Sequence, residues 1–310
     1  MDYADLSRIS VLIPTLNEEK AIGPVIDEVV NTGIPRENIL VIDGGSTDNT
    51  VVIAYRKGVR VYPQEGRGKA LAIKTGLKYV NTPYVLVMDG DWTYPAKYIP
   101  RLYEKMLSED CDLVIGVRVY GKESQKLIFK LGNKVITWIF NMLFGTQLRD
   151  VLSGMYIAKT ETLREVNFEM SGFSVESEIV AHFATVGKVC EEGIEYRERL
   201  DPSAKKLRVV HGFKIALDIL RLTWRYSPVF LIFAIGSLLL IPGLLLGAWV
   251  AYHYFFTGIK YYVRGIVAIV LAATGLLSLN SALMALYVRR IELRVHRKLN
   301  EITKSIKKSS

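Results

Sequence analysis

Two carboxylates in the stretch Asp89-Gly90-Asp91 are the side chains most able to do chemistry in this sequence. They follow a short run, residues 84–88, that is apolar on both faces, as a buried parallel strand is. Alternation along a strand points Asp89 and Asp91 the same way, so both can bind one hard divalent cation. Such a cation would hold a diphosphate at the strand end, where open α/β sheets bind ligands. The alternative is a surface turn, in which Asp and Gly are common.

Two earlier strands are expected to end in polar residues at the same edge of the sheet. Residues 9–14 predict a strand followed by Asn17 and Glu18, and residues 39–42 predict a strand followed by Asp43. Apolar residues at helical spacing lie between the strands, which predicts an α/β fold with a mostly parallel sheet. Neither GxGxxG nor GxxxxGK[ST] occurs, which counts against a dinucleotide oxidoreductase and against a P-loop enzyme.

The C-terminal part of the chain has the composition of a membrane anchor. Residues 229–256 and 265–288 contain no Lys, Arg, Asp or Glu, and each run exceeds the roughly 20 residues that cross a bilayer. We therefore expect two transmembrane helices within residues 228–288, although a pair of buried core helices is the alternative. An amphipathic interface helix is expected at 211–227 and a basic tail at 289–310.

The distribution of basic residues along the chain indicates what the chain binds and how the anchor is oriented in the membrane. The 310 residues carry a net charge of +9, and the basic residues bracket the apolar runs. This pattern favours a membrane surface over nucleic acid, for which no binding motif appears. The excess of Lys and Arg in the tail predicts an integral membrane protein with its globular domain and both termini in the cytosol. The first residues lack the regions of a signal peptide.

The two cysteines, Cys111 and Cys190, stand apart without a CxxC motif or a disulfide framework. We therefore expect two free, inert thiols, as in a reducing compartment.

Four motifs together resemble a known family. VLIPTLNEE, VIDGGSTDNT, GRGKA and VMDGD occur in this order within residues 9–95, as in family 2 glycosyltransferases, which have a GT-A fold. The resemblance implies a GT-A domain over residues 1–210, whose first two loops hold the base and ribose of a nucleotide. Its contacts would be made by Pro14, Leu16, Glu18 and Asp43. The diphosphate would be held by Lys69, Asp89 and Asp91 with a bound Mg²⁺ or Mn²⁺. Where the family usually has a second acid, this chain has Gly44.

The acceptor side of the expected site comes later in the chain. Residues 113–118 predict a strand ending in Arg118. Residues 125–144 predict a helix with a wide apolar face, suited to a membrane interface or, alternatively, to the core. The resemblance assigns the acceptor phosphate to Arg118, Lys126 and Lys130. It places Asp150 and Ser153, in an Asp-x-x-Ser-Gly element, on the acceptor side. A basic loop would bring Arg199 and Lys206 to the sugar nucleotide.

The interface helices and membrane spans narrow the resemblance, over residues 9–290, to the polyprenyl-phosphate sugar synthases, the group that holds dolichyl-phosphate mannose synthase and bacterial undecaprenyl-phosphate glucosyltransferases. It implies a metal-dependent hexosyltransferase with Asp89, Asp91 and Arg118 as catalytic residues. One hexose would pass from a nucleotide-diphosphate sugar, of the GDP-mannose or UDP-glucose type, to a polyprenyl or dolichyl phosphate at the cytosolic membrane face. The mannose synthases have Gln where this chain has Thr93.

Two other functions stay open. One is a family 2 transferase that makes a glycolipid or polysaccharide, although the chain has no QxxRW element. The other is a membrane-tethered scaffold that binds nucleotide sugars without turnover. The sequence leaves the donor sugar, the polyprenol and the oligomeric state open.

Overall fold

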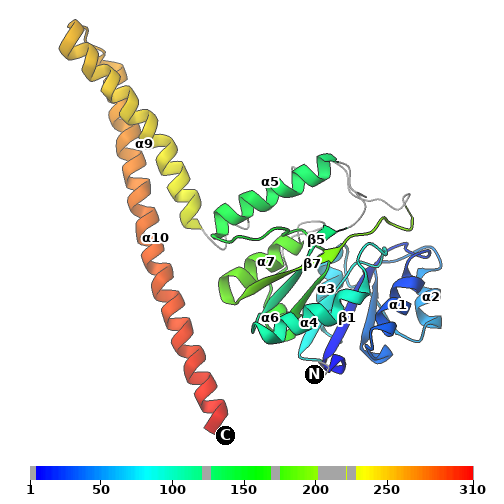
Figure 1. Ribbon diagram of the computed structural model, residues 1–310. Coiled ribbons are helices and arrows are strands. Elements are labelled where there is room, and N and C mark those ends of the chain that lie inside the picture. Colours follow the sequence, from blue (N-terminus) through cyan, green and yellow to red (C-terminus); the bar gives the residue numbers. More distant parts are fainter. Residues whose placement is uncertain (1–4, 121–126, 169–174, 202–220, 222–227, 310) are drawn as a thin grey trace. The chain divides into compact units, whose positions relative to one another are not determined.

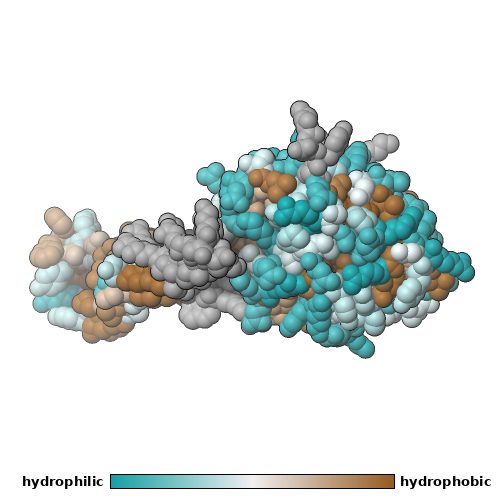
Figure 2. All heavy atoms as spheres, turned by 90° about the horizontal axis from the view of Figure 1, so that it is seen from below, coloured by the Kyte–Doolittle hydropathy of each residue, from teal (hydrophilic) through white to brown (hydrophobic). Residues whose placement is uncertain are grey.

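A computed structural model describes residues 5–120, 127–168, 175–201, 221 and 228–309 (Figure 1). The chain divides into two compact units, Met1–Leu222 and Thr223–Ser310. The surface of the first unit that Figure 2 shows is mainly hydrophilic, with hydrophobic residues in separate patches. The expected interface helix at 211–227 lies outside the described residues, apart from Arg221.

The first unit is built on a seven-stranded sheet with the order β3-β2-β1-β4-β6-β5-β7. Its strands are β1 (Ile9–Thr15), β2 (Ile39–Asp43), β3 (Arg60–Pro63), β4 (Tyr84–Val87), β5 (Leu113–Tyr120), β6 (Tyr156–Lys159) and β7 (Val189–Glu195). Every neighbouring pair is parallel except the two pairs made by β6. The expected α/β fold with a mostly parallel sheet is therefore confirmed.

Helices cover both faces of this sheet. They are α1 (Ile22–Asn31), α2 (Thr50–Arg56), α3 (Lys69–Leu77), α4 (Ile99–Ser108), α5 (Leu127–Phe144), α6 (Thr160–Arg164) and α7 (Val175–Val186). Alternate residues of β1, such as Val11 and Ile13, join the core formed with α1 and α4. Leu12 points to the other face and packs on α3, where a Cβ added to Gly76 would lie 2.2 Å from the Leu12 Cδ1 atom. Glycine at position 76 therefore allows α3 to lie close to the sheet.

The sheet brings five segments to one edge. The chain runs from β1 outward to β2 and β3 and then returns to β4 on the other side of β1. The strand order therefore reverses between β1 and β4, and α/β folds bind ligands at the carboxyl ends of strands at such a point. The antiparallel β6 begins opposite Val87, at the carboxyl end of β4, so residues 145–155 also reach this edge. The ends of β2 and β5 complete it.

Helix α5 has two apolar sides. Ile136, Phe140 and Leu143 are buried in the first unit. The opposite side presents large exposed side chains at Leu131 (64%), Val135 (48%), Trp138 (63%) and Met142 (45%). The buried side agrees with the core-helix alternative, and the interface helix, which the exposed apolar side would suit, stays a prediction.

The expectation of two free thiols is wrong. Cys111 and Cys190 form a disulfide with a Cα–Cα distance of 6.1 Å, which joins the residues just before β5 to β7. Both residues are buried. No local pattern in the sequence indicates this pair, because parallel β5 and β7 bring together residues that are 79 positions apart. The cysteines therefore lend no support to a reducing compartment.

The second unit is a pair of long helices, α9 (Pro228–Tyr252) and α10 (Tyr262–Ser309), which pack side by side (Figure 1). A π-helical turn, His253–Thr257, follows α9. Two segments, Leu231–Thr257 and Tyr262–Val288, are long and apolar enough to cross a membrane. Their helices approach closely at Gly275, where an added Cβ would lie 2.5 Å from the Leu240 backbone nitrogen. Such small residues are typical of helix contacts in membranes. The basic tail continues α10 as a helix.

Candidate active site

Asp89 and Asp91 lie just beyond the last residue of β4, at the sheet edge described above. The strand ends at Val87, and Trp92 has a left-handed backbone with a φ of 73°, so strand alternation does not set the directions of the two carboxylates. Asp89 accepts a hydrogen bond from Lys69 Nζ at 2.5 Å. Asp91 accepts hydrogen bonds from the Thr93 backbone N–H at 3.1 Å and the Thr93 hydroxyl at 2.5 Å. The other oxygen of Asp91 pairs with the Arg199 guanidinium.

Lys69 stands at the start of α3 between two carboxylates. Its Nζ atom lies 2.5 Å from Asp89 Oδ1 and 2.5 Å from Glu176 Oε1. Burial lowers the pKa of Lys69, but the two carboxylates raise it by more, so the pKa lies well above its ordinary value and the ammonium stays charged. Glu176 was not among the predicted site residues. The signal that could have found it is the acidic start of the otherwise apolar α7.

The position of Asp89 depends on a glycine in the expected acceptor element. A Cβ added to Gly154 would lie 2.3 Å from Asp89 Oδ2, so another residue there would displace the carboxylate. The Gly154 backbone N–H donates to the buried Tyr94 hydroxyl at 2.7 Å. Ser153, predicted on the acceptor side, is buried and donates to the Gly116 carbonyl at 2.5 Å. In this structure Ser153 ties the turn before β6 to β5.

Arg118 and Asp150 form a two-point ion pair. Arg118 Nε lies 2.6 Å from Asp150 Oδ2 and its terminal nitrogen 2.7 Å from Oδ1, and Asn133 Nδ2 on α5 donates to Oδ1 at 2.9 Å. Burial raises the pKa of Asp150, but Arg118 and Asn133 lower it by more, so the carboxylate stays ionised. Arg118 also lies over the Tyr196 ring, 5.4 Å from its centroid. The expected position of Arg118 at a strand end is wrong, because β5 continues to Tyr120.

The segment after β7 closes on the turn that carries Asp91. The Arg197 backbone N–H donates to the Thr93 carbonyl at 2.9 Å, and its guanidinium lies over the Trp92 ring. Arg199, two residues later, pairs with Asp91 and lies 3.8 Å from Glu18 Oε1. Arg199 therefore connects the loop after β1 to the loop after β4.

The loops after β1 and β2 hold each other in place. Asp43 Oδ2 accepts hydrogen bonds from the backbone N–H groups of Gly45 at 2.9 Å and Ser46 at 3.0 Å. Asn17, with a φ of 53°, accepts a hydrogen bond from the Thr47 backbone at 2.8 Å. At Gly44, an added Cβ would lie only 3.1 Å from Gln64 Oε1 and 3.2 Å from the Thr15 carbonyl. The fold around this turn therefore leaves little room for the acid that the family resemblance would place there.

The remaining predicted residues lie in less informative places. Pro14 is half-buried in β1, and Leu16 is 38% exposed in the loop after it. Lys126 and Lys206 lie outside the described residues. Lys130 belongs to α5, but its side chain is also outside the described part. The cation cluster expected for an acceptor phosphate is thus represented here by Arg118.

The donor set fits a hard divalent cation. Asp89 and Asp91 offer carboxylate oxygens, which Mg²⁺ and Mn²⁺ prefer, and a diphosphate and water can supply the other ligands. Within the described residues, three acidic, His or Cys side chains converge to ligand distance only at Glu109, Cys111 and Cys190. Two of those three are joined in the disulfide, so that group does not suit a metal.

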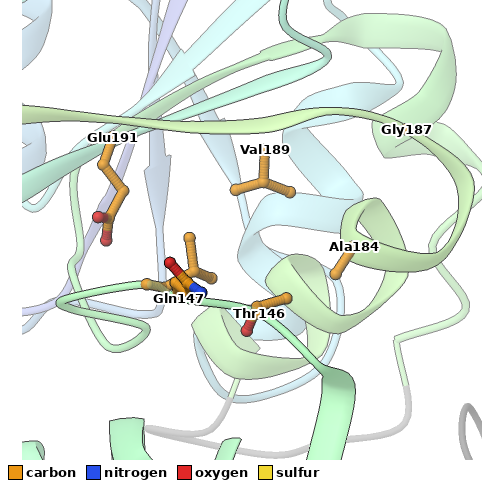
Figure 3. A pocket seen from close by; sticks show the side chains of 7 residues that line it. Thr146, Gln147, Ala184, Gly187, Val189 and Glu191 are labelled. Carbon is orange, nitrogen blue, oxygen red and sulfur yellow. The ribbon is translucent and has the colours of Figure 1, made fainter. Parts of the chain in front are cut away.

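A separate pocket of about 370 Å³ lies beside Glu191 of β7 (Figure 3). Its lining comes from the loop after α5, from α7 and from β7, and consists of Thr146, Gln147, Leu148, Ala184, Gly187, Val189 and Glu191. The Glu191 carboxylate accepts hydrogen bonds from the Arg149 backbone at 2.6 Å and the Asp150 backbone at 3.3 Å. None of the predicted site residues lines the pocket. Glu191, which does, accepts a hydrogen bond from the backbone of Asp150, the partner of Arg118.

Comparisons with known proteins show which family the chain resembles. Residues 10–166 match the model of the family described as "Glycosyl transferase family 2". "Glycosyltransferase AglJ" from Haloferax volcanii is 32% identical over 265 residues, 84% of this chain and 86% of that protein. A "Dolichyl-phosphate hexose transferase" from the same organism is 31% identical over 204 residues, 63% of this chain and 88% of that protein.

The solved structures that resemble the chain show its fold. Glucosyl-3-phosphoglycerate synthase from Mycobacterium tuberculosis, in complex with Mn²⁺, uridine-diphosphate-glucose and glycerol 3-phosphate, is 23% identical. The match covers 74% of this chain and 85% of the chain of the synthase, with a TM-score of 0.58. The likeness indicates a GT-A fold.

Proposed function

The chain belongs to glycosyl transferase family 2, and from this membership we propose that it transfers one hexose from a nucleotide-diphosphate sugar to a polyprenyl or dolichyl phosphate. The proposed donor is of the GDP-mannose or UDP-glucose type, and the proposed product is a polyprenyl-phosphate monosaccharide. The observation that carries the proposal is the set of three partly buried ion pairs at one sheet edge, Lys69–Asp89, Arg199–Asp91 and Arg118–Asp150.

The donor side of the proposal rests on the first two of these pairs. Asp89 and Asp91 would hold a divalent cation, Mg²⁺ or Mn²⁺, which supplies positive charge to the diphosphate when bound. Lys69 and Arg199 add fixed positive charge beside the same two carboxylates. A departing nucleoside diphosphate gains negative charge, and positioned cations stabilise that charge most where water is excluded. Asp91 and Lys69 are both largely buried, as this role requires.

The acceptor side of the proposal rests on the Arg118–Asp150 pair. A phosphate monoester carries between one and two negative charges near neutral pH, so it needs no strong general base to become a nucleophile. It needs a cation that brings it next to a second anion. Asp150 holds the Arg118 guanidinium in one orientation through two contacts, and Glu191 in turn fixes the Asp150 backbone. The relative named dolichyl-phosphate hexose transferase supports a lipid phosphate as the acceptor.

We further propose that the enzyme works at the cytosolic face of a membrane. The exposed apolar side of α5, formed by Leu131, Val135, Trp138 and Met142, suits a helix that lies in the lipid interface. The two apolar segments of the second unit suit transmembrane helices, and the basic residues after Val288 favour cytosolic termini. These features together would bring the site to the headgroup of a lipid acceptor.

One experiment tests donor and acceptor together. Membranes that contain the full chain are incubated with separate radiolabelled GDP- and UDP-sugars, with and without added polyprenyl phosphate, and the lipid is extracted. We expect label in the lipid fraction for one donor, dependent on polyprenyl phosphate and abolished by a chelator. Label in a polymer or in a neutral glycolipid would support the alternative transferase. Donor binding without label transfer to any acceptor would support the non-enzymatic scaffold.

A further inference from the structure

A polar side chain lies exposed in the second apolar segment of the membrane unit. Asn280 is on α10, eight residues before the end of that segment at Val288, or about 12 Å along the helix axis. The hydrocarbon core of a bilayer is about 30 Å thick, so the Asn280 amide lies at hydrocarbon depth. Within the described part of the chain it makes no hydrogen bond. An unsatisfied amide in lipid is costly, so a partner at the same depth is needed.

The face around Asn280 points away from α9. Leu276, Leu277 and Met284 fall within about 60° of Asn280 on the helix and are 62%, 67% and 66% exposed. The contact with α9 is made on the other side of α10, at Gly275 and at the buried Ala282. The neighbouring hydroxyl of Ser281 donates to the Leu277 carbonyl within α10, so it needs no outside partner. Asn280 is therefore the polar centre of an otherwise apolar, uncovered face.

This face continues along α10 beyond the apolar segment. Eleven positions after Asn280 and Met284 come Ile291 and Val295, which are 46% and 52% exposed. A repeat of 11 residues, or 3.67 residues per turn, keeps one face nearly straight along an α-helix. The sequence continues the pattern with apolar residues at positions 302 and 306. The α10 seam, defined here as the face of Asn280, Met284, Ile291 and Val295, thus extends from hydrocarbon depth past the end of the span.

We propose that two copies of this chain pair along the α10 seam, in parallel and about a twofold axis, with the two Asn280 amides bonded to each other. The proposal rests on α9 and α10 crossing a bilayer. A bilayer gives every copy the same orientation, so each residue of a symmetric pair meets its own counterpart at the same depth. An amide carries both donors and an acceptor, so two Asn280 side chains can satisfy each other.

A second copy fits the seam better than other occupants do. A lipid chain can cover Leu277 and Met284 but offers no partner for the amide and cannot reach Ile291 or Val295 beyond the bilayer. A soluble partner can reach only the latter two. Another α10 helix has both parts at the right depth. The basic residues of the two tails would repel each other, so pairing is expected to strengthen as salt screens them.

The test measures association of the full chain in phosphatidylcholine vesicles, by energy transfer between differently labelled copies over a range of protein-to-lipid ratios. We expect a dimer in the unaltered protein. Asn280→Leu should weaken it roughly 3- to 30-fold, the range found for polar contacts between membrane helices, and Asn280→Gln should largely retain it. Ser281→Ala is the matched control and should leave the affinity unchanged. A monomer at every ratio, or equal affinities for Asn280→Leu and the unaltered protein, would overturn the proposal.

A second measurement locates the contact face. Met284→Cys places a thiol on the seam, and Leu286→Cys places one at similar depth about 140° from the seam centre, at a position that is also exposed. Mild oxidation should cross-link the first variant into a covalent dimer and leave the second largely monomeric. Equal cross-linking of both, or a preference for Leu286→Cys, would show that the copies meet elsewhere. Neither measurement depends on sugar transfer, so both remain informative if the proposed reaction is wrong.

Discussion

Three acidic side chains of the candidate site are each paired with a cation from another part of the chain. Lys69 of α3 pairs with Asp89, Arg199 after β7 with Asp91, and Arg118 of β5 with Asp150. The Asp91 and Asp150 side chains are only 5% and 4% exposed, so loss of the cation partner would leave a buried carboxylate uncompensated. The pairs therefore fix the geometry of the edge before any ligand arrives.

The first prediction concerns the carboxylate expected to bind metal. Asp91→Ala should abolish transfer and remove the metal-dependent part of donor binding, because Asp89 alone is a poor site for a hard cation. Calorimetric titration of sugar nucleotide with and without Mn²⁺ measures this effect directly. Asp27→Ala is a suitable control, because Asp27 forms an ion pair with Lys57 that is partly exposed. Equal Mn²⁺ enhancement of donor binding in Asp91→Ala and the unaltered protein would disprove the metal assignment.

The second prediction concerns the cation expected to bind the acceptor. Arg118 meets Asp150 through two nitrogens, and Lys can offer only one point charge there. Arg118→Lys should slow transfer by about tenfold or more, equivalent to at least ~1.4 kcal/mol, while donor affinity stays near normal. The rate is measured against polyprenyl-phosphate concentration and the donor affinity by calorimetry. Weakened donor binding with an unchanged lipid dependence would assign Arg118 to the donor side instead.

Residue types at the site were readable from sequence, but most of their partners were not. The acids after β4 stand out because a motif and a strand end coincide, and Lys69 at the start of α3 stands out because it belongs to the GRGKA motif. Glu176 lies 107 positions after Lys69, and no local pattern shows that the two meet. The same holds for Arg199 and Asp91. Pairing across the sheet edge depends on which strands are neighbours, and that order is a property of the whole fold.

At the scale of elements, long apolar runs predicted strands and helices reliably, but a change in strand direction within the sheet could not be predicted. The strands at the start of the chain and the two apolar helices lie close to where their periodicity placed them. The antiparallel strand β6 was not predicted, and strand composition carries no information on direction. It matters here, since only a strand that starts at the carboxyl edge brings Gly154 against Asp89. The helical tail was also missed, since its many charged residues indicated only a basic segment.

The third prediction concerns the disulfide between Cys111, just before β5, and Cys190 of β7. A bond that closes a loop of 79 positions restricts the unfolded chain and should contribute about 4.5 kcal/mol by the chain-entropy estimate. We expect the double variant Cys111→Ala, Cys190→Ala to unfold at a lower temperature than the full chain with its disulfide. We also expect no thiol labelling of the unaltered protein when it is denatured without reductant. Quantitative labelling of two thiols would show that the disulfide does not form.

At the scale of the whole molecule, charge and apolar surface are divided between the two units. Residues 223–310 contain 11 Lys and Arg against 2 Asp and Glu, so they carry the whole net charge of +9. The first unit is neutral overall and holds the site. A neutral domain has no general attraction for nucleic acid, and a basic unit with two long apolar helices suits an anionic membrane surface. The charge pattern thus agrees with a division into a soluble site and an anchor.

The last prediction separates these two roles by truncation. The sheet, its core and the described site residues all lie before residue 222, within one compact unit. A chain that ends before Pro228 should therefore fold and keep its affinity for the sugar nucleotide. Transfer to long polyprenyl phosphates should fall strongly, since such acceptors stay in the bilayer and the fragment would have only the proposed contact of α5 with lipid. Short, water-soluble prenyl phosphates should be used about as well by both forms.

Assays on the two acceptors in parallel distinguish loss of anchoring from loss of folding. A fragment that fails on both acceptors and does not bind donor has not folded, and circular dichroism identifies that case. A fragment as fast as the full chain on long acceptors would show that the spans have no part in acceptor use. Adding Trp138→Glu to the fragment tests the remaining contact, because Trp138 is 63% exposed on α5 and a charge there opposes insertion into lipid. We expect this change to remove the residual activity on vesicle-bound acceptor and to leave activity on soluble acceptor unchanged.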